Sequence, residues 1–96
     1  MSPLKRKKLS KIRSQLDKLD NSLIKFIKKR SNLVKKVLNL KEKKNQIIDR
    51  KRIKFILKNI RNKSIKNKID PKITNRIWKN MIYAYIDFEK GNFKKK

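Results

Sequence analysis

Two cations, Arg30 and Lys41, have the types and the spacing to bind a small anion. They lie 11 residues apart, which is about three turns of a helix, so their side chains would fall within about 20° of one another. Their Cα atoms would be ~16 Å apart along the helix axis. Long side chains that reach toward each other from these positions could enclose a ligand. The spacing therefore predicts an anion site between them, provided that one helix carries both.

Three more charged residues could join this site from other parts of the chain. Arg13 lies 17 residues before Arg30, about 25 Å away and turned by ~100° on a helix. It cannot easily reach the same small ligand within its own chain, whereas in an antiparallel dimer it could reach the site of the partner chain. Arg52 and Glu89 could approach from later helices.

Such a site would hold several cations, one carboxyl group and no obvious base. The sequence contains no His and no Cys, which removes thiolate chemistry and argues against the usual zinc sites. This inventory suits a reaction without a nucleophile or proton transfer, such as the pericyclic rearrangement of a dicarboxylate. The protein must then clamp both carboxylates, which Arg does bidentately, and donate to the oxygen that gains charge. We expect neither a cofactor nor a metal.

The stretch 9–40 must position the first of these residues. It contains no Pro and no Gly, so nothing in it stops a helix, which would be about 47 Å long. A compact globule of 96 residues is only roughly 30 Å across, so one chain cannot cover this helix. We therefore expect an intertwined helical homodimer. Its apolar stripe has residues three or four positions apart and is interrupted once, by the cation Arg30. The stripe comprises Leu9, Ile12, Leu16, Leu19, Leu23, Phe26, Leu33, Val37 and Leu40.

Two shorter helices are expected after the first helix ends in the polar run 42–46. Asp49 is a good N-cap for the second helix, whose apolar residues again recur at helical spacing. Residues 62–69 have no sustained period and predict a linker. Asp70 and Pro71 then predict the start of a third helix. The apolar stripe of the second helix comprises Ile53, Ile56, Leu57 and Ile60.

The third helix is expected to run to about Lys90, with Gly91 as a natural stop. It has two apolar faces, and Glu89 continues the second of them, where a carboxylate is costly unless it is paired or protonated. We therefore expect an all-α fold with three helices per chain, in a single domain over 1–96 with a core at 9–90 and a basic tail at 91–96. The first face comprises Ile73, Ile77, Met81, Ala84 and Phe88, and the second comprises Trp78, Ile82 and Tyr85.

The net charge of +25 is extreme, with 32 Lys and Arg against 7 Asp and Glu. A basic nucleic-acid-binding protein is one interpretation. However, Lys, Asn and Ile, whose codons are rich in A and T, make up 49 of the 96 residues, and only 7 of the basic residues are Arg. Drift in an A/T-rich genome would give the same surface, and specific nucleic-acid contacts favour Arg. Weak, non-specific polyanion binding is expected in either case.

No segment of the sequence predicts a membrane association. The longest apolar run, residues 81–86, is far too short to span a membrane. The basic N-terminal residues have no apolar segment behind them, so a secretory signal is not expected. We interpret the protein as cytoplasmic.

In these motifs the chain resembles the all-α chorismate mutases, intertwined helical homodimers that convert chorismate to prephenate. The resemblance covers residues 9–89 and implies an isomerase in the biosynthesis of Phe and Tyr, with chorismate as its substrate. Its motifs are Ile12-Arg13 with Asp17 and Asp20, Arg30 with Lys41, Asp49 with Arg52, Asp70-Pro71, and the run 81–89.

The resemblance also implies roles for these residues. Arg30 would bind one substrate carboxylate, and Arg13 of the partner chain would bind the other. Lys41 would donate to the ether oxygen and to one carboxylate. Arg52 would help to hold the substrate and to order the loop at Asp49.

Three positions depart from the commonest family pattern. Ile53 replaces a Glu that holds the substrate hydroxyl, and Tyr85 replaces a Ser. Glu89 replaces a Gln that donates to the ether oxygen, and a carboxyl group can donate there only when it is protonated. Some fungal members also carry Glu at that position. The other two changes are similar to isochorismate-pyruvate lyase on the same fold, which remains the alternative function.

Each candidate also has a purely structural interpretation. Arg30 could set the register of a coiled coil, and Glu89 could simply pair with a nearby Lys. Tyr85 could be a core residue. Arg13, Lys41 and Arg52 could each be solvated surface charges. The order in which these residues occur together, rather than any one of them, favours the enzyme.

Overall fold

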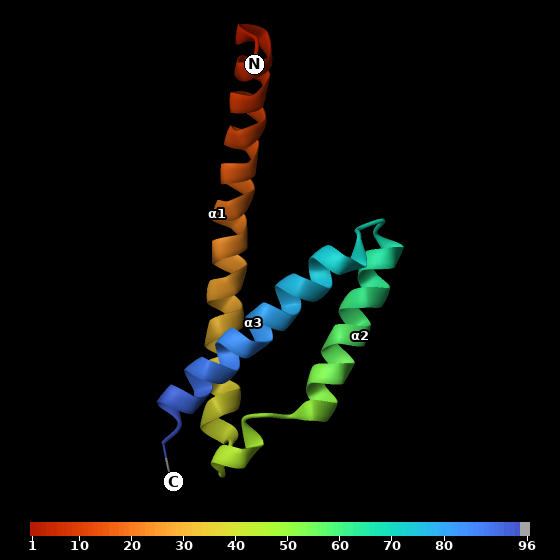
Figure 1. The fold of residues 1–96 in the computed structure, drawn as a ribbon. Helices are drawn as coiled ribbons and strands as arrows, with labels where there is room; N and C mark the ends of the chain where they lie inside the picture. Colours follow the sequence, from red (N-terminus) through yellow and green to blue (C-terminus); the bar gives the residue numbers. More distant parts are fainter. Residues whose placement is uncertain (95–96) are drawn as a thin grey trace. The chain divides into compact units, whose positions relative to one another are not determined.

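The computed structural model describes residues 1–94, and that range contains helices and no strand (Figure 1). This confirms the predicted all-α fold with three α-helices and a long first one. The elements are α1 (Pro3–Leu40), the short 3-10 helix η1 (Lys44–Gln46), α2 (Arg50–Lys66) and α3 (Pro71–Asn92).

Helix α1 is 38 residues long, and only its C-terminal end differs from the prediction. Its start is capped by Ser2, whose Oγ accepts a hydrogen bond from the Lys5 amide at 3.2 Å. The first turns of α1 are helical from Pro3 onward. The helix ends at Leu40, before the polar run 42–46, because that run forms its own short turn.

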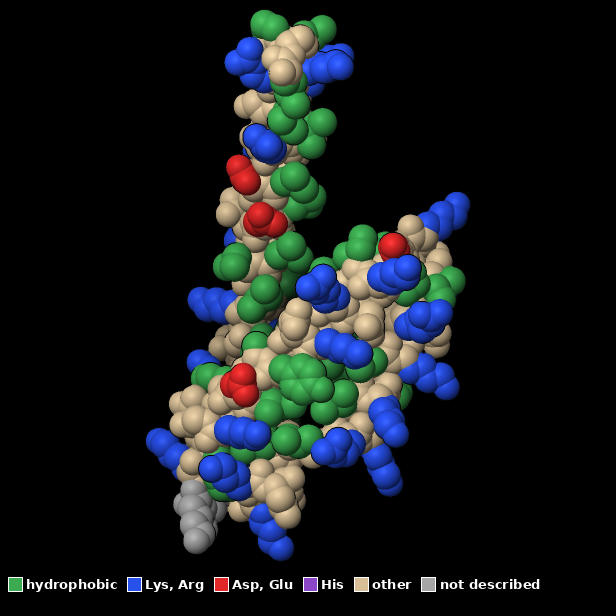
Figure 2. Space-filling view, in the orientation of Figure 1, with side chains coloured by type: hydrophobic (Ala, Val, Ile, Leu, Met, Phe, Trp, Pro, Cys, Tyr) green, Lys and Arg blue, Asp and Glu red, His purple; other side chains and the backbone are tan. Residues whose placement is uncertain are grey.

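The chain divides into two compact units, residues 1–33 and the part from Val34 onward. The first unit is a single helical segment, and its apolar stripe is exposed. Ile12, Leu16 and Phe26 are 55%, 53% and 64% exposed. Figure 2 shows such green side chains along this segment.

Helix α2 starts where the sequence predicted it, because the Asp49 carboxylate accepts a hydrogen bond from the Arg52 amide at 3.0 Å. The predicted linker 62–69 is wrong in its first half, since α2 continues to Lys66. Buried Ser64 explains the difference: its Oγ lies 2.6 Å from the Ile60 carbonyl oxygen and 2.6 Å from Thr74 Oγ1 of α3. This tertiary contact stabilises a helical turn that has no apolar period of its own.

The junction between α2 and α3 is short. Lys68 adopts a positive φ of 57°, the left-handed conformation in which helices often end. Asp70 then caps α3, because its carboxylate accepts from the Lys72 amide at 2.9 Å, and Pro71 follows at the first helical position. The predicted start of α3 is confirmed.

Helix α3 extends slightly beyond its predicted end. Gly91 lies within the last turn, and Asn92 closes that turn by donating from its side chain to the Phe88 carbonyl oxygen at 2.9 Å. Phe93 packs against the core, although it belongs to the segment that was expected to be a basic tail. Lys94 is exposed, and the last two residues of the expected tail lie outside the described residues.

The core lies in the second unit, where α2 and α3 form a helical hairpin (Figure 1). It consists of four buried apolar residues with partly buried neighbours around them. Ile82 and Ile86 come from the second face of α3, and Ile47 comes from the loop before α2. Leu38 belongs to α1 but not to the predicted stripe. It lies on a separate face, on which Val34 and Lys41, four positions before it and three after it, are partly buried. The partly buried neighbours are Ile53, Ile56, Leu57, Phe88 and Phe93.

Candidate functional site

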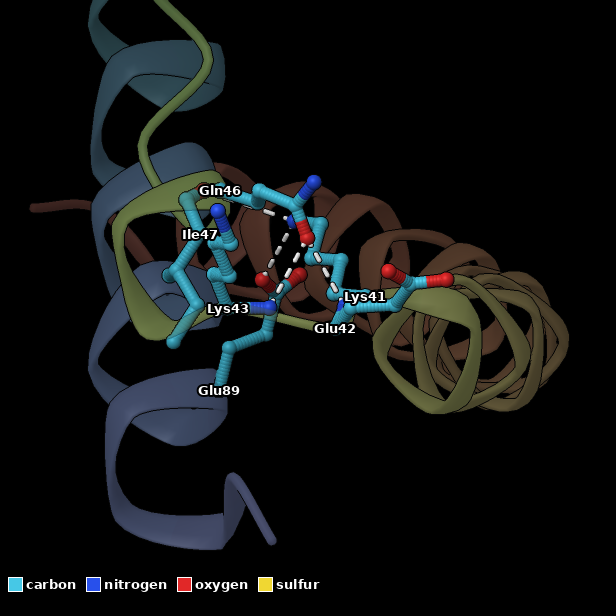
Figure 3. A network of polar contacts seen from close by, with 6 residues as sticks. All are labelled: Lys41, Glu42, Lys43, Gln46, Ile47 and Glu89. Atoms are coloured by element: carbon cyan, nitrogen blue, oxygen red, sulfur yellow. Dashed lines mark hydrogen bonds and ion pairs between the residues drawn. The ribbon is translucent and has the colours of Figure 1, made fainter. Parts of the chain in front are cut away.

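An ion pair joins Lys41 and Glu89 in the second unit (Figure 3). Lys41 Nζ lies 2.8 Å from Glu89 Oε2, although the residues are 48 positions apart in the sequence. Their side chains are only 17% and 9% exposed, so water screens their attraction less than in a surface pair. The structure thus brings together two residues that the sequence proposed for one site.

Lys41 is the first residue after the end of α1. Besides Glu89, its ammonium group contacts the main-chain carbonyl oxygen of Ile47 at 3.4 Å. A lysine ammonium has three N–H donors, and these two contacts use two of them. The third donor could serve an oxygen atom of a ligand without the loss of either contact.

Glu89 lies on the buried face of α3, one turn after Tyr85 in the predicted stripe, and only 7% of its surface is exposed. A buried carboxylate is strongly unfavourable without a partner. From the sequence this group was expected to be either paired or protonated, and the structure shows it paired with Lys41.

A surface hollow of about 580 Å³ opens beside Lys41. Its polar lining carries three cations and one carboxylate, which favours an anionic occupant. Of its charged residues, Lys41 and Asp49 were predicted site residues, whereas Arg50 and Lys51 were missed, as was Gln46. Arg50 and Lys51 directly follow Asp49 in the sequence, and this is their only sequence signal. The hollow is lined by Val37, Leu40, Lys41, Gln46, Ile48, Asp49, Arg50 and Lys51.

Arg52 does not line this hollow. Its main-chain amide bonds to the Asp49 carboxylate, and its guanidinium group lies over the Phe55 ring, 5.2 Å from the ring centroid. Both residues are exposed. The expected link between Arg52 and the loop at Asp49 is therefore made by the main chain, and a substrate contact by the guanidinium group stays a prediction.

Ile53 and Tyr85 are both partly buried. Ile53 packs against the hydrophobic core, so its side chain acts there as an ordinary core residue. Tyr85 lies four positions before Glu89 on α3. A substrate contact by Tyr85 stays a prediction.

Arg13 and Arg30 belong to the first unit. Arg13 is exposed, and Arg30 is partly buried although its neighbours in the apolar stripe are exposed. Their expected roles in carboxylate binding stay predictions, as does the contribution of Arg13 across a dimer.

Residues 1–94 contain no cluster of three or more His, Cys, Asp or Glu side chains that could hold a metal ion. None of the helices in this range combines the length and the apolar character that crossing a membrane requires.

Comparison with known proteins gives one match. Residues 12–90 match the family model for chorismate mutase type II. No curated protein matches the chain, and no solved structure does. The matched range contains all the candidate residues, from Arg13 to Glu89.

Proposed function

Because the chain belongs to the chorismate mutase type II family, we propose that it is an isomerase that converts chorismate to prephenate. The reaction breaks an ether C–O bond as a new C–C bond forms, within one molecule and without a nucleophile. The product would enter the biosynthesis of Phe and Tyr. No cofactor or metal takes part in this proposal.

The observation that carries the proposal is the Lys41–Glu89 contact of 2.8 Å beside a cationic hollow. In the proposed reaction, Lys41 donates to the ether oxygen as negative charge develops there. Glu89, when protonated, donates to the same oxygen. Donors fixed in advance at the point of developing charge are a large source of rate acceleration.

The two substrate carboxylates need a clamp, and we assign it to Arg30 and to Arg13 of a second copy. The resemblance to the family supports both assignments. The homodimer is supported by the exposed apolar stripe of α1, in which Leu19, Leu23 and Leu33 are 55% to 61% exposed. Such a stripe is unfavourable in water and fits a second long helix.

Isochorismate-pyruvate lyase is the second candidate, because the hydroxyl-binding carboxylate of the mutases is replaced by Ile53. The side chain of Ile53 packs against the core and can accept no hydrogen bond. Tyr85, partly buried on α3, is similar to the residue that the lyases have at this place. This candidate uses the same hollow and the same cations.

The test is an assay of the purified full chain on chorismate and on isochorismate, from acid to neutral pH. We expect prephenate from chorismate. Pyruvate and salicylate from isochorismate, without efficient mutase turnover, would assign the chain to the lyases. Turnover of neither substrate would reject both candidates and favour a basic helical protein whose partner is nucleic acid.

A further inference from the structure

The side chain of Gln46 helps to hold the turn that follows Lys41. Its Oε1 accepts two main-chain hydrogen bonds, from the Glu42 amide at 2.7 Å and from the Lys43 amide at 3.0 Å. These two amides lie directly beyond the end of α1, where the helix no longer supplies acceptors to the chain that leaves it. Gln46 thus fixes the direction of the chain immediately after Lys41 (Figure 3).

The same turn sets the place of the Ile47 carbonyl group. Main-chain bonds close η1, from Gln46 N to Lys43 O at 3.0 Å and from Ile47 N to Lys44 O at 3.2 Å. Ile47 itself is anchored in the core with 4% exposure. Its carbonyl oxygen then lies 3.4 Å from Lys41 Nζ. The ammonium group thus has a main-chain acceptor in addition to the Glu89 carboxylate.

From these contacts we infer that Gln46 is a positioning residue for Lys41. The inference rests on the proposed function, in which Lys41 is the donor to the ether oxygen. Gln46 touches no reacting atom in this account. It acts by fixing the turn that supplies one of the two acceptors of the Lys41 ammonium group, so that the third N–H of that group has a defined direction.

In Gln46 the group that fixes the turn is the acceptor oxygen Oε1, which substitutions can remove or keep. Gln46→Ala removes the acceptor for both amides, whereas Gln46→Glu keeps a carboxylate oxygen at the same distance along the side chain. Asn45→Ala is the matched control, because Asn45 is an exposed residue in the same short turn. All three are made in the full chain.

The kinetic readout is mutase activity, with kcat and KM measured separately. We expect Gln46→Ala to lower kcat roughly 10- to 100-fold, with a smaller change in KM, because small displacements of a catalytic group have effects of this size. Asn45→Ala should stay within about twofold of the wild type, and Gln46→Glu should recover most of the loss. Equal kcat in Gln46→Ala and the wild type, or no recovery in Gln46→Glu, would overturn the inference.

The second readout is independent of activity. Hydrogen exchange measured by NMR should show the Glu42 and Lys43 amides protected in the wild type and in Gln46→Glu, and unprotected in Gln46→Ala. The ammonium signal of Lys41, identified by its loss in Lys41→Met, should broaden or shift in Gln46→Ala alone. If these signals behave as expected in a protein that turns over no chorismate, the proposed function fails and the turn geometry stands. Protected amides or an unchanged Lys41 signal in Gln46→Ala contradict the geometry itself.

Discussion

At the scale of single residues, Lys41 and Glu89 share a contact that serves both stability and the proposed chemistry. The buried carboxylate of Glu89 would be strongly unfavourable without the lysine ammonium group. The lysine, in turn, can act as a preorganised donor only when its ammonium group is held in a fixed direction. In the resting structure the contact is an ion pair. In the proposed reaction the same two groups donate to one oxygen, which the carboxyl group can do only after it gains a proton.

Replacing Glu89 with Gln separates these two functions. A carboxyl group donates only when it is protonated, whereas an amide always donates, so Glu89→Gln should keep mutase activity and remove any dependence of the rate on that proton. The measurement is kcat/KM as a function of pH for both proteins. Glu42→Gln is the matched control. Glu42 is exposed, and its contact with Gln46 is made by its main-chain amide, which the substitution leaves in place. Identical pH profiles in the wild type and Glu89→Gln would remove Glu89 from the site.

At the scale of elements, the helix starts could be predicted because they depend on local residues. Asp49 caps α2 and Asp70 caps α3, each within three positions of the amide that it binds. The end of α2 could not be predicted, because Ser64 is held by Thr74 of the next helix. In the same way, Leu38 is buried by tertiary contacts although the periodicity of the first stripe excludes it.

The Ser64 contact gives a prediction about the hairpin of α2 and α3. Ser64→Ala removes a buried hydroxyl and leaves Thr74 Oγ1 with one partner fewer, which should lower the free energy of unfolding by about 1–3 kcal/mol. Thr74→Ser keeps the hydroxyl group and should lower it less. The measurement is urea unfolding followed by circular dichroism. A Ser64→Ala variant as stable as the wild type would show that the pair does not hold the helices together.

At the scale of the whole molecule, the length of the first helix was the sequence feature that predicted an oligomer. In the structure the apolar stripe of α1 is exposed. The Lys41–Glu89 contact needed the tertiary fold, because no local pattern joins residues 48 positions apart. From the sequence, Glu89 could only be expected to approach the site from a later helix, and the resemblance to the family supported that expectation. Gln46 was missed, because a residue that accepts from the main chain has no periodicity to reveal it. Figure 2 also shows Lys and Arg side chains spread over α2 and α3, which suits an anionic substrate.

The proposed assembly of the site from two chains predicts a complementation pattern. Arg13→Ala and Arg30→Ala should each be inactive as pure proteins. When the two are unfolded together and refolded as an equal mixture, about one quarter of the wild-type activity should return, because half of the dimers are mixed and each mixed dimer has one intact site. The measurement is the rate of prephenate formation.

A second mixture controls for this result. Arg30→Ala refolded with Lys41→Ala should recover nothing, since both residues come from the same chain in any one site. Recovery in this control, or no recovery in the first mixture despite dimers in solution, would contradict the assignment of Arg13 to the partner chain.

The central claim is that this chain rearranges chorismate with Lys41 as the donor to the ether oxygen. The most direct measurement is the initial rate of prephenate formation by the wild type, Glu89→Gln and the double variant Lys41→Met with Glu89→Gln, which leaves no unpaired charge in the buried site. We predict turnover by the first two proteins and a loss of roughly 100- to 1,000-fold in the double variant, with its helical circular dichroism unchanged. No prephenate from folded wild-type protein at any pH, or equal rates in the two variants, would contradict the claim.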